Sequence, residues 1–78
     1  MRLSELNIGD TCIFNKNEDP VFRTKMLEMG ITQGTLLRMS MKAPFGGPIA
    51  FEFDNTTLSI RLEDAEEIII DPIKAVDS

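Results

Sequence analysis

Apolar residues recur at every second position along most of the chain, which is the spacing of strands with one buried face. In 35–41 the odd positions 37, 39 and 41 are apolar, whereas the even positions mix one leucine with polar residues. In 49–54 the odd positions are again apolar, and in 58–62 the even ones are. Two shorter apolar runs, at 11–14 and 68–70, are also rich in residues that favour strands. The pattern therefore predicts five short strands.

Residues 19–30 break this alternation and have the pattern of a helix. Asp19 can cap the first turn and Pro20 suits the first helical position. Gly30 is expected to end the helix with a positive φ. The apolar stripe of this helix consists of Phe22, Met26 and Met29, with Leu27 beside it.

The change of parity between the third and fourth strands constrains their connection. Odd apolar positions on one strand must face even ones on the next, so the loop must hold an even number of residues. Asp54-Asn55 or Asn55-Thr56 as a two-residue turn meets this requirement. Leu62–Ala65 is expected to form a single helical turn, and the last strand is expected to pair with the first. The fold class is thus mainly β: a small closed barrel of about five strands, with one short helix over an opening.

The length and net charge of the chain exclude several classes of function. A chain of 78 residues forms one domain, and its formal net charge of −5 disfavours nucleic acid and anionic membranes as partners. No segment is apolar over the roughly 20 residues of a membrane span or resembles a signal peptide. Cys12 is the one cysteine, which excludes an intrachain disulfide and suits a reducing compartment. We therefore expect a cytoplasmic protein, in which Cys12 is a small core residue.

The candidate chemistry is sparse. The chain has no histidine, so it lacks the usual general base and the commonest transition-metal ligand. We therefore expect no enzymatic activity and no cofactor. The one candidate for metal binding is a weak, oxygen-rich cation site on an acidic cluster at 63–67. The cluster consists of Glu63, Asp64, Glu66 and Glu67.

The loop between the second and third strands is the more distinctive feature. It has a proline near each end and two adjacent glycines, and Phe45 stands at its tip. Two interpretations remain open at this point. Phe45 either folds back onto the core or is an exposed aromatic anchor of the kind enriched at interfaces. The loop consists of Ala43, Pro44, Phe45, Gly46, Gly47 and Pro48.

Four blocks of the chain together resemble the FeoA family, the small cytosolic component of bacterial ferrous iron transport. Residues 22–34 (FRTKMLEMGITQG) are similar to its R-x-x-L-L-x-M-G-L-x-P-G segment, and 43–49 (APFGGPI) to its A-P-L-G-D-P-I loop. Residues 58–61 match its L-x-L-R strand, and 63–68 match its acidic closing turn. Three positions depart from the pattern: Gln33 replaces proline, Phe45 replaces leucine and Gly47 replaces aspartate.

The resemblance implies an SH3-like barrel over residues 1–72, with 73–78 as a disordered tail. It also implies a partner, the membrane ferrous iron transporter with its cytosolic GTP-binding domain. We expect a non-enzymatic regulator that acts by contact, through the loop 43–48 together with Arg23 and Lys25 of the helix. The alternatives are a metal-sensing SH3-like domain that uses the acidic cluster, and a GTPase activator with Arg23 or Arg61 as its arginine finger. Self-association is left open.

Overall fold

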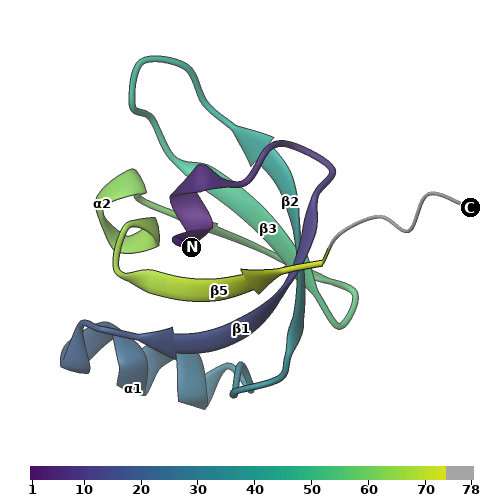
Figure 1. The fold of residues 1–78 in the computed structure, drawn as a ribbon. Helices are drawn as coiled ribbons and strands as arrows, with labels where there is room; N and C mark the ends of the chain where they lie inside the picture. The colour runs from purple at the N-terminus through teal and green to yellow at the C-terminus, as the bar shows by residue number, and fades with distance from the viewer. Residues whose placement is uncertain (74–78) are drawn as a thin grey trace, which may run out of the picture.

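The computed structural model describes residues 1–73 and contains a single five-stranded antiparallel sheet in the order β4-β3-β2-β1-β5 (Figure 1). The predicted tail falls almost wholly outside the described residues. The strands are β1 (Thr11–Asn17), β2 (Leu36–Lys42), β3 (Ile49–Phe53), β4 (Thr56–Ile60) and β5 (Ile68–Pro72). The helical segments are η1 (Leu3–Glu5), α1 (Pro20–Glu28) and α2 (Leu62–Ala65). The prediction of a mainly β fold with five strands and one short helix is confirmed.

The sheet is not closed, in contrast to the closed barrel that we expected. β4 and β5 lie at its two ends and are joined through α2, because Leu62–Ala65 coil into a helical turn instead of continuing β4. The outer edge of β5 is occupied by the N-terminus: Arg2 forms an isolated bridge with Ile69, and the N–H of Ile70 donates to the carbonyl of Met1 at 2.8 Å. The expected pairing of the last strand with the first is confirmed.

The core lies inside the curve of the sheet and is closed by η1, whose Leu3 is fully buried. Alternating positions of β2 and β3 contribute to this core, as predicted: Leu37, Met39, Ile49, Phe51 and Phe53. Met41 is an exception, with 43% of its surface exposed. A register shift between Met39 and Met41 inserts an extra residue opposite β3, and such a bulge turns the following side chain off the inner face.

Helix α1 begins as predicted, because the carboxylate of Asp19 accepts a hydrogen bond from the N–H of Val21 at 3.0 Å. Gly30 follows its end with φ 89°, the left-handed conformation that a glycine adopts without strain. The predicted apolar stripe is only partly buried: Met26 is in the core, but Met29 is 36% exposed, and Leu27 beside it is 56% exposed. Because this nine-residue helix packs mainly against β1, only one narrow face of it is buried.

The β3–β4 connection is the two-residue turn Asp54-Asn55, with φ 47° and 60°. Both values are positive, as the tight turn that matches the twist of a hairpin requires. This turn places Phe51 opposite Leu58 and Ile49 opposite Ile60, so the apolar faces of the two strands coincide. The parity argument is thus confirmed.

Candidate partner-binding site

The loop between β2 and β3 is held rigidly by its own backbone. At its base, the N–H of Ala43 donates to the carbonyl of Pro48 at 2.9 Å. At its tip, the N–H of Gly47 donates to the carbonyl of Pro44 at 3.2 Å, which closes a turn around Phe45 and Gly46. These two residues have φ values of 60° and 73°. The loop is therefore two nested hydrogen-bonded turns, not a flexible connection.

Phe45 projects fully into solvent, with a relative exposure of 104%. The hypothesis that its ring folds back on the core is therefore wrong. A left-handed conformation costs a residue with a side chain roughly 1–2 kcal/mol, so this position combines backbone strain with an unburied aromatic ring. Residues in such conformations cluster at functional sites.

The two adjacent glycines serve different purposes. Gly46 has a positive φ, which a glycine adopts without strain. Gly47 does not, but a Cβ there would lie 2.8 Å from the Cβ of Ala43 and 3.2 Å from the carbonyl oxygen of Pro44. Gly47 is thus needed for space across the base of the loop. The aspartate that the family pattern has at this position would require the loop to shift.

Lys42 anchors the loop to the rest of the molecule. Its Nζ donates to the carbonyl oxygens of Ser4 and Leu6, each at 2.9 Å. These carbonyls flank the end of η1, so the lysine ties the start of the loop to the N-terminal segment that closes the core. Sequence reasoning missed this role, because nothing in the pattern indicates that a lysine at a strand end reaches residues 36 and 38 positions away.

The structure does not bring Arg23 and Lys25 next to the loop. Figure 1 shows α1 at one end of the molecule and the β2–β3 loop at the other. The Nε of Arg23 also donates to the carbonyl of Asn17 at 3.0 Å, and so braces the connection between β1 and α1. The expected single contact face of loop and helix is therefore not formed, because the two segments extend from opposite ends of the sheet.

Asn17 lies beyond the run 11–14 that predicted the first strand, yet it is a buried residue at the end of β1. Its Oδ1 accepts a hydrogen bond from the N–H of Asp19 at 2.8 Å, and its Nδ2 approaches the sulfur of Met26 at 3.4 Å. Asn17 therefore orients the start of α1. Together with the bond from Arg23, this network gives the arginine a structural role.

Arg61 is a second cation near the base of the loop, besides Lys42. It follows Ile60, which pairs with Ile49 at the end of the loop. Its side chain is 79% exposed, and its Nε lies 3.6 Å from a carboxylate oxygen of Asp64. An ion pair this exposed contributes about 0–1 kcal/mol, so the guanidinium is free to meet a partner.

The acidic cluster is dispersed around α2 and the turn after it. Among residues 1–73, no group of three or more His, Cys, Asp or Glu side chains is placed to hold a metal ion. Asp64 is partly engaged by Arg61, and Glu66 and Glu67 are exposed. The cation site therefore remains a prediction, since its carboxylates are not arranged around a common point in the described residues.

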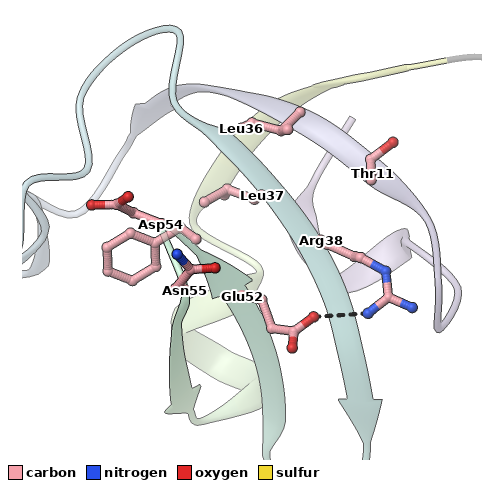
Figure 2. Close-up of a pocket in the computed structure, with 8 residues that line it drawn as sticks. Thr11, Leu36, Leu37, Arg38, Glu52, Asp54 and Asn55 are labelled. Atoms are coloured by element: carbon pink, nitrogen blue, oxygen red, sulfur yellow. Dashed lines mark hydrogen bonds and ion pairs between the residues drawn. The ribbon is translucent and has the colours of Figure 1, made fainter.

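A hollow of about 240 Å³ lies beside the start of β2 and the β3–β4 turn (Figure 2). Arg38 and Glu52 join across neighbouring strands beside it, with Nη1 to Oε1 at 2.7 Å. Both side chains are about half exposed, so this pair adds little stability. The hollow contains none of the predicted site residues and is lined by Thr11, Leu36, Leu37, Arg38, Glu52, Phe53, Asp54 and Asn55.

Cys12 lies in the core and is fully buried. Burial, with a smaller contribution from the charge of Asp71, raises the pKa of its thiol to about 11. A thiol that stays protonated is a poor nucleophile and a poor metal ligand.

In the part of the chain that the structure describes, no helix is long and apolar enough to cross a membrane.

The sequence of this chain is similar to known proteins of one family. The FeoA domain family model matches residues 1–72. A fusion of Fe(2+) transport protein A with the Fe(2+) transporter FeoB, from Porphyromonas gingivalis, is 36% identical over 76 residues, which is 96% of this chain. This chain spans 9% of the length of that fusion protein.

Solved structures show the same fold. The FeoA protein of Chlorobium tepidum superposes with a TM-score of 0.88 at 28% identity, covering 99% of this chain and 74% of that one. A FeoA of Stenotrophomonas maltophilia complexed with zinc, a prokaryotic SH3 domain protein, gives a TM-score of 0.79 at 25% identity over 91% of this chain and 89% of that one. The SH3-like description of the small open barrel is thus confirmed.

Proposed function

This chain belongs to the FeoA family, which is linked to ferrous iron transport, and from that premise we propose that it regulates a membrane ferrous iron transporter by direct contact. The contact is made on the cytoplasmic side with the GTP-binding part of the transporter. The protein performs no chemistry of its own in this role. The fusion of a similar domain to FeoB in one relative supports physical proximity between the two.

The observation that carries the proposal is Phe45, which is wholly exposed on a strained backbone with φ 60°. A phenylalanine in such a position costs stability and contributes nothing to the core. Aromatic anchors of this kind supply much of the binding free energy at interfaces when they enter a pocket on the partner. The hydrogen-bonded loop also lowers the entropic cost of binding, because the backbone that carries the anchor is already held in place.

The surroundings of Phe45 indicate what the partner must offer. Leu62 lies beneath the loop, since a Cβ on Gly46 would meet its side chain at 3.8 Å. Arg61, next to it, contributes a positive charge on an otherwise acidic protein. The complementary surface is therefore an apolar pocket with a carboxylate at its rim. Arg23 and Lys25, at the other end of the molecule, belong to this contact only if the partner is large enough to span both ends.

The test is an amide chemical-shift titration of this protein with the GTP-binding region of its transporter, in the GTP-bound and GDP-bound states. We expect shifts at 43–49 and at Arg61 and Leu62. Phe45→Ala should weaken binding by about 2 kcal/mol or more, the cost typical of a central anchor. Phe45→Leu, which restores the residue of the family pattern, should keep most of the affinity.

Leu36→Ala is the matched control, because Leu36 is also an exposed apolar side chain (55%) but lies at the opposite end of β2. If it weakens binding as much as Phe45→Ala, the loop is not the contact. Shifts confined to α1 would transfer the contact to Arg23 and Lys25. An absence of shifts in both nucleotide states, at partner concentrations of about 1 mM, would contradict contact with this region altogether.

A further inference from the structure

The outer edge of β4 is the one sheet edge that residues 1–73 leave uncovered. β3 occupies its other side, and no described residue pairs with it beyond β3. The corresponding edge of β5 is covered by Met1 and Arg2. An unpaired edge is a template for another strand, and proteins usually protect it with charges, proline or a bulge. The segment Thr56–Ile60 has none of these.

The turn geometry determines which groups this edge presents. Phe53 and Thr56 flank the two-residue turn, so they exchange both of their backbone hydrogen bonds. Because the pattern alternates along an antiparallel pair, Leu58 and Ile60 also bond to β3. The N–H and C=O groups of Thr57 and Ser59 therefore point away from the sheet.

We propose that this edge pairs with the same edge of a second copy, forming a two-fold symmetric antiparallel dimer centred on Leu58. In this register Thr57 of one copy faces Ser59 of the other. These are the two residues with outward-pointing groups, so both positions form hydrogen-bonded pairs and all four outward N–H groups are satisfied. A pairing centred on Thr57 would instead place Ser59 opposite Asn55 in the turn.

Side chains agree with this register on both faces of the sheet. Thr57 and Ser59 are exposed, and their hydroxyl groups would meet across the new strand pair. Leu58, on the inner face, is half-buried and would contact the Leu58 of the second copy. Each copy thus covers the part of the leucine that its own core leaves exposed.

Charges at the ends of the strand are complementary as well. Arg61 would face Asn55 of the second copy and lie beside Asp54, and the two-fold axis repeats this contact at the other end. Both of these charged residues are exposed, and Arg61 has only a long contact with Asp64. An unrelated extended peptide would have to reproduce this arrangement, whereas a second copy has it by symmetry.

The test combines sedimentation velocity with amide hydrogen exchange over a range of protein concentrations. We expect a weak dimer with a dissociation constant between about 0.1 and 1 mM, because one short strand pair forms a small interface. The amides of Thr57 and Ser59 should become protected as the concentration rises. The amides of Leu58 and Ile60 should be protected at every concentration.

The double variant T57K/S59K places like charges opposite each other across the dimer and should raise its dissociation constant at least about tenfold. Its matched control, T24K/Q33K, adds the same charge at exposed positions away from β4 and should leave dimerisation unchanged. Phe45→Ala should also leave it unchanged, which separates this proposal from the one for the loop. A protein that stays monomeric at about 1 mM overturns the proposal. So does a dimer in which Thr57 and Ser59 exchange freely, or a monomer in which they are already protected.

Discussion

Replacing Lys42 with methionine tests whether this lysine holds the loop in place. Methionine keeps the unbranched apolar stem but removes the ammonium group, so the carbonyls of Ser4 and Leu6 each lose a hydrogen bond of 2.9 Å. Hydrogen bonds to charged groups contribute about 1.5–3 kcal/mol each, and these are partly exposed to water. We therefore expect the free energy of unfolding to fall by about 2–3 kcal/mol in total.

The assay is urea unfolding, with thermal unfolding as a second measure. For a domain of this size, the expected loss lowers Tm by roughly 10–20 °C. Lys16→Met is the matched control, since Lys16 is an exposed lysine on β1 and its replacement changes the net charge equally. If the Lys42 and Lys16 variants differ by less than about 0.5 kcal/mol, the anchoring role is refuted.

Four further outcomes follow from the structure. Arg23→Ala should lower stability by about 1–2 kcal/mol in urea unfolding, since it removes a hydrogen bond to a backbone carbonyl; unchanged stability would contradict a structural role. Gly47→Ala should destabilise the loop and increase amide exchange at its base, and a wild-type exchange pattern would contradict the predicted clash. The buried thiol of Cys12 has a raised pKa, so stability should be constant below about pH 9 and fall as the pH rises from 9 to about 11; Cys12→Val should abolish this slope. Titration of Fe²⁺ or Mn²⁺ should give no micromolar binding at residues 63–67, whereas micromolar affinity would revive the metal-sensing alternative.

The strands were predictable because the alternation of apolar and polar residues lies within each strand's own sequence. Alternation identifies the buried face, and parity required an even turn, which Asp54-Asn55 supplies. The start of the helix at Asp19 was also predictable from the sequence, because a capping side chain accepts a hydrogen bond from a backbone N–H only two or three positions away.

Other expectations failed where local and tertiary preferences compete. The apolar residue at Met41 was expected in the core, but the bulge before it depends on how β2 and β3 twist together. The first strand was predicted over 11–14 only, but β1 extends to Asn17, whose buried amide contacts the N–H of Asp19 and the sulfur of Met26.

For the candidate site, the sequence by itself determined the loop: its prolines, its paired glycines and the aromatic residue at its tip are local features. The tertiary structure decided that Phe45 is exposed, that Lys42 fastens the loop to η1, and that Arg23 and Lys25 lie at the far end of the molecule. It also decided that β4 keeps an open edge. The physical reason is range. Turn chemistry and periodicity act over a few residues, whereas exposure, anchoring and edge pairing depend on which distant segments meet, and that is known only once the sheet has formed.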